Sequence, residues 1–173
     1  INAALKLAGR EPMILRRSDG YIGTLIDDLV TKGTNEPYRM MTSRSEYRLL
    51  LRQDNADERL TPIGRRVGLI GDERYAKFLK KQELINAELS RIEGVTLAPG
   101  DVNPILAAAG TTEISSGARL AEILRRPGIS YEMLAPADKN RPDLPADVRE
   151  EVEIKVKYDG YIKRQLRQAE QFI

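Results

Sequence analysis

Apolar side chains recur every three to four residues between positions 72 and 92, the spacing that places them along one face of an α-helix. The stripe consists of Tyr75, Phe78, Leu79, Ile85, Leu89 and Ile92. Lys80, Lys81 and Glu88 fall outside this stripe. The pattern predicts a helix over 72–92 with one face directed towards a core.

The same periodicity predicts a helix from Tyr21 to Lys32. Its apolar positions are Ile22, Leu25, Ile26, Leu29 and Val30. Asp19 is suited to cap the start of this helix and Gly33 to end it. Asp27 and Asp28 are adjacent and so face different directions on a helix, which favours a solvated face over a catalytic carboxylate pair.

A third helix is predicted here, because Thr42 or Ser43 can cap it, and Ser43 and Glu46 have the spacing of a capping box. Arg44, Arg48 and Arg52 would then lie at i, i+4 and i+8 on one face. We call these three residues the arginine ladder. A further helix is expected from Glu58 to about Gly64.

The second half of the chain contains shorter elements. After a loop through 99–101, Asn103 and Pro104 are expected to open an Ala-rich helix, with proline at the tolerated first position. Another helix is predicted from Ala118 to Arg126, and 136–145, with three prolines, is predicted to be an exposed loop.

The segment from Ala146 to the end fits two structures. Val152, Ile154, Val156 and Tyr158 alternate with charged residues, as in a strand. The spacing also fits a helical stripe, and about 25 uninterrupted residues are too long for a typical strand. We therefore predict a helix, and a mainly α fold: a C-terminal helical domain or bundle preceded by a short remnant of another fold.

Composition excludes several kinds of chemistry. The 173 residues include no Cys and no His, which rules out thiolate nucleophiles, zinc sites that need Cys or His ligands, and Ser-His triads. No apolar run approaches the roughly 18 residues of a membrane span, so we expect a cytoplasmic protein. The glycines form neither GxGxxG nor a P-loop, which disfavours an independent nucleotide-dependent enzyme.

The arginine ladder is the main candidate for binding. Together with Arg39 it could follow a nucleic-acid backbone, while Tyr38 and Tyr47 could stack on unpaired bases. The alternative is structural, because acidic residues that could pair with the arginines are interleaved: Glu36, Glu46, Asp54, Asp57 and Glu58.

The stretch Glu36–Asp57, EPYRMMTSRSEYRLLLRQDNAD, closely resembles the signature of the GidA/MnmG family of flavin-dependent tRNA uridine 5-carboxymethylaminomethyl modification enzymes. Residues 1–5, 19–30 and 156–165 also resemble segments of that family. Two positions depart from the pattern expected of the family: Ser45 stands where Ala is expected, and Met41 where Phe is expected.

The resemblance implies a parent enzyme that modifies position 5 of the wobble uridine in tRNA. It implies FAD, NADH and a methylene-tetrahydrofolate carbon donor, with glycine or ammonium as a further substrate. It also implies a partner GTPase of the MnmE type and a homodimer within a hetero-oligomeric complex, without a membrane.

The resemblance also implies a domain organisation. Residues 1–18 would be the tail of the FAD-binding fold, 19–71 a helical connector with the arginine-rich signature, and 72–173 the C-terminal helical domain. Because the chain opens without Met and lacks Cys, we expect it to be the C-terminal part of a longer protein. Ile1 and Asn2 would lie near the flavin only in the parent, so we expect this chain alone to bind no FAD and to be inactive.

Two functions remain open. The chain could be a tRNA-recognition and docking module that uses Arg39, Arg44, Arg48 and Arg52 with Tyr38 and Tyr47. Alternatively, it could be a protein-interaction module without direct tRNA contact, which binds the GTPase or associates with itself. The candidates for that surface lie in the last helix: Tyr158, Tyr161, Lys163 and Arg164. Core packing of this helix is the structural alternative.

Overall fold

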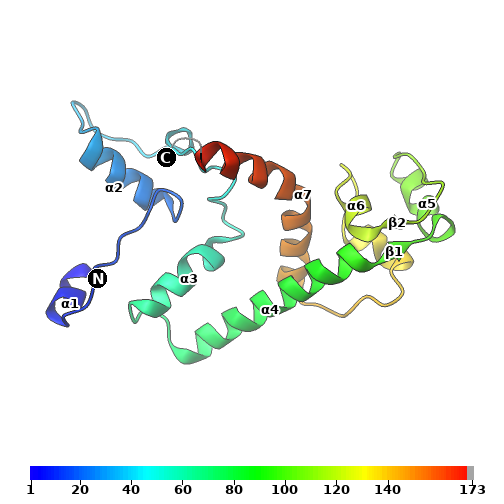
Figure 1. The fold of residues 1–173 in the computed structure, drawn as a ribbon, viewed down its shortest axis with the longest axis horizontal. Helices are drawn as coiled ribbons and strands as arrows, with labels where there is room; N and C mark the ends of the chain where they lie inside the picture. Colours follow the sequence, from blue (N-terminus) through cyan, green and yellow to red (C-terminus); the bar gives the residue numbers. More distant parts are fainter. Residues whose placement is uncertain (171–173) are drawn as a thin grey trace. The chain divides into compact units, whose positions relative to one another are not determined.

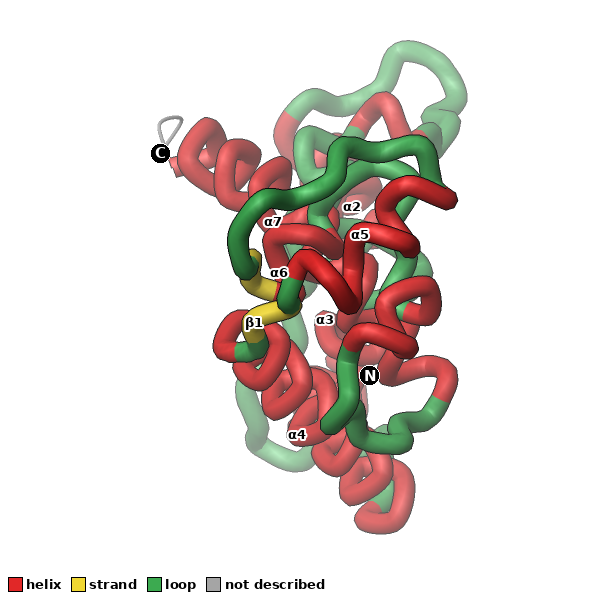
Figure 2. Tube along the Cα trace, turned by 90° about the vertical axis from the view of Figure 1, so that its right-hand side faces the viewer, coloured by secondary structure: helices red, strands yellow, loops and turns green. Residues whose placement is uncertain are grey.

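Helices make up most of the protein, as Figure 1 shows for this computed structural model. The structure describes residues 1–170, without the side chains of 160, 163–166 and 168–170. In Figure 2, the strands of the described chain (yellow) are short, and helices predominate. The prediction of a mainly α fold is therefore confirmed.

The chain divides into two compact units, Ile1–Leu79 with the chain from Arg164 onward, and Lys80–Lys163. The first unit contains α1 (Asn2–Leu7), α2 (Tyr21–Thr31), the 3₁₀ helix η1 (Thr42–Arg44) and α3 (Ala56–Arg66). The second contains β1 (Thr96–Leu97), α5 (Pro99–Ala108), β2 (Ala118–Arg119), α6 (Leu120–Leu124) and the 3₁₀ helix η2 (Glu132–Ala137). Two long helices, α4 (Asp72–Gly94) and α7 (Ala146–Glu170), run through both.

The core of the second unit settles the ambiguous last segment as a helix. Val148, Val152 and Val156 are buried at four-residue spacing along α7, while Tyr158 is 39% exposed. A strand would have buried Ile154 with Val152 and Val156 on one face. Val148, Val152 and Val156 share one hydrophobic cluster with the fully buried Ile85 and Ile92 of α4.

The predicted helix over 118–126 is shorter than expected. Ala118 and Arg119 instead form β2, antiparallel to β1, with Thr96 opposite Arg119 and Leu97 opposite Ala118. Helix α6 then starts at Leu120, and Lys157 of α7 donates hydrogen bonds to two carbonyl oxygens near its end, at Leu124 and Arg126 (2.8 and 3.0 Å).

The start of α5 also differs from the prediction. The helix opens at Pro99, so Pro99 rather than Pro104 takes a first-turn position where a missing N–H costs nothing. The Asn103 side chain joins Ile114 instead, with its amide nitrogen donating to the carbonyl (2.9 Å) and its oxygen accepting from the backbone N–H (2.8 Å).

Glu88 was predicted to lie off the apolar stripe of α4, yet it is only 2% exposed. Its carboxylate accepts from the Tyr131 hydroxyl (2.7 Å) and from Arg91, which also binds Asp138 with both terminal nitrogens (3.0 and 2.6 Å). Arg141 lies over the Tyr131 ring at 3.7 Å and donates to Asp138. A buried network of two arginines and two carboxylates therefore ties α4 to the segment around η2.

Burial and hydrogen bonding shift the pKa values in this network. Burial raises the pKa of Tyr131 to about 12, and the hydrogen bond to Glu88 adds to the rise. Burial opposes ionisation of Asp138, but hydrogen bonds from Arg91 and Arg141 outweigh it and lower its pKa. Hydrogen bonds to Glu88 and then Asp138 raise the pKa of Arg91.

Helix α2 forms as predicted, but its apolar stripe faces outward. Ile22 and Ile26 are each 53% exposed and Val30 is 79% exposed. The buried face carries Gly23, Thr24 and Asp28 instead.

Contacts with the preceding loop explain the orientation of α2. A Cβ on Gly23 would lie 2.1 Å from the Arg16 carbonyl oxygen, so only glycine permits this approach. Gly20, not Asp19, is the N-cap, because the Asp19 carboxylate accepts from the Arg16 backbone N–H (2.8 Å). Gly33 follows the helix at φ +65°, consistent with its predicted role at the end.

Candidate nucleic-acid interface

Arg17 is the centre of an ion cluster in the first unit. Its Nη1 lies 2.9 Å from Asp27 and 2.7 Å from Asp28, and its Nε lies 2.7 Å from Glu46. Its Nη2 donates to the second Glu46 oxygen (3.0 Å) and to the Arg44 carbonyl (3.2 Å). One guanidinium therefore joins α2 to the start of the arginine-rich segment.

Asp28 is the buried member of this cluster, with a side chain 4% exposed. The hydrogen bond from Tyr38 contributes most to lowering the pKa of Asp28, and the bond from Arg17 adds to it. Together they outweigh the opposing effect of burial. The prediction of a solvated acidic face was therefore wrong for Asp28. The hydrogen bond from Arg17 likewise lowers the pKa of Glu46, while burial and the bond to Asp28 raise the pKa of Tyr38.

The arginine ladder does not form as predicted, because no helix covers 45–52. Only η1 is helical here, and Ser45 is extended, at φ −100° and ψ 129°. The buried Ser45 hydroxyl accepts from the Tyr47 N–H (3.1 Å), and Glu46 is bound to Arg17 instead of returning to cap a helix. Tertiary contacts thus outweigh the local helix signal.

Asn55 completes this irregular segment. Its side-chain nitrogen donates to the Leu50 carbonyl (2.8 Å), and its oxygen accepts from the Arg52 backbone (3.3 Å) and from Arg59 (2.9 Å). Arg59 also donates to the carbonyls of Asp19 and Arg52 (2.6 and 2.9 Å). The 45–55 turn is therefore held by side chains that replace helical hydrogen bonds.

The four arginines proposed for tRNA contact lie in different environments. Arg52 is structural: its side chain is 16% exposed and pairs with Asp54 at 3.0 Å. Arg39 and Arg48 are exposed, and no described residue makes an ion pair or side-chain hydrogen bond with either guanidinium. Arg44 is exposed, and its Nε donates to the Arg39 carbonyl (2.8 Å).

The two candidate tyrosines also differ. The Tyr38 hydroxyl donates to Asp28 (2.7 Å), and Arg44 lies over its ring at 4.4 Å. Tyr47 is half-buried beside Ser45. The structure therefore brings Tyr38 and Arg44 together, and leaves Arg39 and Arg48 directed to solvent on the same segment.

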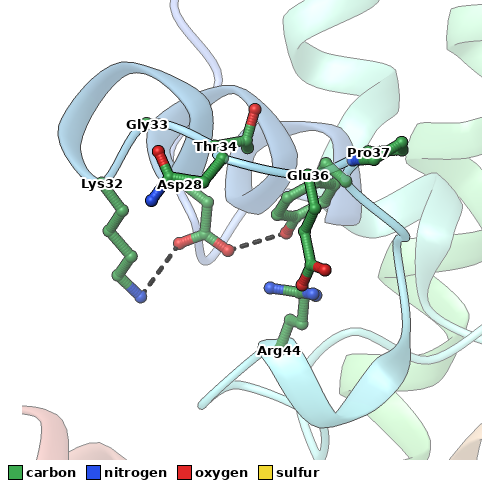
Figure 3. Close-up of a pocket in the computed structure, with 9 residues that line it drawn as sticks. Asp28, Lys32, Gly33, Thr34, Glu36, Pro37 and Arg44 are labelled. Atoms are coloured by element: carbon green, nitrogen blue, oxygen red, sulfur yellow. Dashed lines mark hydrogen bonds and ion pairs between the residues drawn. The ribbon is translucent and has the colours of Figure 1, made fainter.

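A pocket of about 340 Å³ opens beside Tyr38 and Arg44. Figure 3 shows Lys32 and Asp28 on one wall, Thr34 and Glu36 along the connecting loop, and Arg44 across from them. Lys32 pairs with Asp28 at 3.2 Å, yet its side chain is 71% exposed.

Sequence reasoning missed two residues that build this site. Arg17 lies in a polar stretch with no periodicity, and the sequence around Arg59 gives no sign of its contacts. The one available signal was the adjacent acidic pair Asp27 and Asp28, which needs a cationic partner if either member is buried.

The two residues considered for a cofactor, Ile1 and Asn2, lie at the start of the described chain. Ile1 is 53% exposed, and the Asn2 amide is bound to the backbone N–H and carbonyl of Met13 (2.7 and 3.0 Å). Across residues 1–170, the described acidic side chains form no cluster suited to a metal ion, and no described helix is long and apolar enough to cross a membrane.

The candidate partner surface lies on α7. Tyr158 is 39% and Tyr161 58% exposed, with ring centroids 6.5 Å apart. Lys163 and Arg164 were also proposed, but their side chains lie outside the described residues. A groove of about 450 Å³ is lined by residues of the second unit: Leu89, Glu93, Arg125, Lys155, Val156, Asp159 and Ile162.

The chain resembles known proteins over its whole length. The MnmG of Caldicellulosiruptor saccharolyticus, named a tRNA uridine 5-carboxymethylaminomethyl modification enzyme, is 61% identical, and that of Lachnoclostridium phytofermentans is 58% identical. Each alignment covers 99% of this chain but 28% of the relative, so the chain spans little more than a quarter of their length. The structure of Aquifex aeolicus GidA matches with a TM-score of 0.83 and 34% identity, covering 98% of this chain and 26% of that one.

A family model agrees with these likenesses. It describes the C-terminal helical domain of the tRNA modifying enzyme MnmG/GidA, and it matches residues 72–166, from the start of α4 into α7. Because this domain takes up more than half of the chain, and the fold agrees with a solved member, the protein belongs to the MnmG/GidA family of tRNA modifying enzymes.

Proposed function

We propose that this chain supplies a tRNA-recognition surface to an FAD-dependent enzyme that modifies position 5 of the wobble uridine. The observation that carries the proposal is the exposure of Arg39, Arg44 and Arg48 on one irregular segment. A guanidinium offers a planar fork of donors that matches phosphate oxygens two at a time. Arg52 is left out of this surface, because its guanidinium is bound to Asp54.

The irregular backbone leaves two of these arginines available for a ligand. Here the ion pair from Arg17 to Glu46 and the turn held by Asn55 fix the segment without using the guanidiniums of Arg39 or Arg48. Glu46, one of the interleaved acids, is bound to Arg17, and no ion pair joins the described acids to Arg39 or Arg48.

Catalysis is assigned to the longer enzyme. FAD, NADH and methylene-tetrahydrofolate would supply its redox and one-carbon chemistry, and we propose a cytoplasmic homodimer that works with an MnmE-type GTPase. Of the two residues considered near the flavin, the Asn2 amide is bound to the backbone of Met13, so we assign it no cofactor contact and no chemical step. We propose 1–18, 19–71 and 72–173 as the parts of the chain.

A titration of the chain with unmodified tRNA at two salt concentrations tests this function. Each phosphate contact contributes about 0.7–0.9 to the slope of log affinity against log salt, so Arg48→Ala should weaken binding and make the slope shallower by about that amount. Arg74→Ala, which removes an exposed arginine on α4, is the matched control. Equal affinity and slope for Arg48→Ala and the unaltered chain would refute the surface proposed here.

A second candidate is a protein-docking role for α7. The exposed pair Tyr158 and Tyr161 and the groove beside α7 favour it, since tyrosines are enriched in protein interfaces. Tyr161→Ala should then reduce capture of the GTPase, while Tyr161→Phe, which keeps the ring, should retain most of it. Equal capture by both variants would argue against this surface.

A further inference from the structure

We propose that the pocket beside Tyr38 and Arg44 receives one unpaired nucleotide of the RNA and prefers guanine to uracil. This inference deepens the proposed function and rests on it. It concerns a site next to the exposed arginines, with recognition of a base rather than of the phosphate backbone.

The pocket has the dimensions and lining of a small-ligand site. Its volume, about 340 Å³, lies near the lower end of the ~300–1,000 Å³ range of such sites. Its walls combine a flat stacking surface, a cation and several polar loop residues. A single nucleotide needs these three features together.

The stacking surface is held in place before a ligand arrives. The Tyr38 ring is anchored by its hydroxyl bond to Asp28, which Arg17 holds in turn (2.7 Å for each bond). Arg44 lies over that ring at 4.4 Å, with its Nε bound to the Arg39 carbonyl. Unpaired bases stack on aromatic rings and on guanidinium planes, and a fixed platform lowers the entropy cost of binding.

The polar wall favours one type of base edge. Glu36 is exposed and extends towards Arg44 in Figure 3. An ionised carboxylate only accepts hydrogen bonds. Guanine presents two adjacent donors, N1–H and N2–H, whereas uracil presents one N–H between two carbonyl oxygens. Glu36 therefore attracts guanine and repels the oxygens of uracil.

Other charged groups of the pocket complete the assignment. We exclude Asp28 as a second base-edge acceptor, because its side chain is only 4% exposed and its oxygens already accept from Arg17, Lys32 and Tyr38. Lys32 uses one contact to Asp28, and its side chain is 71% exposed, which leaves donors for a phosphate. The site thus offers a stacking surface for the base at Tyr38 and Arg44, a hydrogen-bond acceptor for the base edge at Glu36, and a phosphate contact at Lys32.

The test is a titration of the whole 173-residue chain with 5′-GMP and 5′-UMP, followed by backbone NMR shifts. GMP should bind at least several-fold more tightly than UMP, with shifts concentrated in residues 28–44. Glu36→Gln should remove the preference, because an amide both donates and accepts. Arg44→Ala should weaken GMP about tenfold, and Arg74→Ala should leave it unchanged.

Equal binding of the two nucleotides, shifts outside 28–44, or an unchanged preference in Glu36→Gln would overturn the inference. Glu36 is exposed, so Glu36→Gln keeps the fold. It therefore remains informative even if Arg44→Ala does not fold. The two proposals fail separately. Salt-dependent tRNA binding that Arg48→Ala weakens, without GMP selectivity, would leave the proposed function standing and remove the nucleotide pocket.

Discussion

Arg17 binds Glu46 through two parallel contacts, Nε to Oε1 at 2.7 Å and Nη2 to Oε2 at 3.0 Å, although 29 positions separate them in the chain. This geometry is the bidentate fork that makes arginine–carboxylate pairs both strong and directional. It takes Glu46 away from the capping box that the sequence suggested and orients the segment that carries Arg44 and Arg48.

Replacing Arg17 should destabilise the first unit. Arg17→Ala leaves the buried Asp28 without its main cationic partner and removes the clamp on Glu46, so we expect a loss on the order of 3 kcal/mol in the free energy of unfolding. Urea denaturation measures this change. Arg16→Ala, next to it but with an exposed side chain, should cost less than about 0.5 kcal/mol. Similar losses in both variants would contradict the role of Arg17.

The acidic cluster predicts a pH dependence of stability. The pKa values of Asp28 and Glu46 are lower in the folded chain than their usual range. Their stabilisation is therefore present above the unfolded values of about 4 and is lost as the pH falls through the folded ones. Urea midpoints should begin to fall below about pH 5 and keep falling below pH 3, and Glu46→Gln should show a shallower fall. Parallel curves for the two proteins would contradict the assignment for Glu46.

The buried network of the second unit should be sensitive to the loss of one charge. Arg91→Ala leaves Glu88 and Asp138 buried without their shared partner, and we expect a cost of roughly 3–5 kcal/mol. Tyr131→Phe removes one hydrogen bond to Glu88 and should cost only about 1–2 kcal/mol. Thermal or urea unfolding measures both. A larger loss for Tyr131→Phe would overturn this ranking.

The exposed face of α2 should tolerate polar side chains. Val30→Lys should change the free energy of unfolding by less than about 0.5 kcal/mol, because Val30 is 79% exposed. Ile85→Ala in the core, at 0% exposure, should cost about 2–5 kcal/mol. Urea denaturation of the two variants side by side checks the contrast. A loss for Val30→Lys near that of Ile85→Ala would mean that the face is covered.

Elements that depend on local periodicity could be predicted from the sequence. Helices α4 and α7 follow from their apolar spacing, and in α7 the helical stripe through Val148, Val152 and Val156 prevails over the strand-like alternation. Helix α2 was also predicted, but not which face is buried, because Gly23 and Asp28 pack against a loop that periodicity cannot describe.

The candidate site was less predictable, because long-range polar contacts shape it. The capping-box spacing of Ser43 and Glu46 was a genuine local signal, but the fork from Arg17 outweighs it. Likewise, nothing near Glu88 in the sequence indicates that Tyr131 and Asp138 meet Arg91 and Glu88 inside the protein. The sequence singled out Tyr38 and Arg44 as candidates, and the structure shows that Arg44 lies over the Tyr38 ring.

The cluster around Arg17 also has a kinetic consequence. Three carboxylates, those of Asp27, Asp28 and Glu46, bind Arg17, and residues 27–48 together carry four acidic and four basic side chains, so this stretch is electrically balanced. Long-range steering of an anion depends on net charge, whereas short-range grip depends on individual donors. For the tRNA that we propose as ligand, this surface should therefore accelerate encounter only modestly and act mainly by slowing departure.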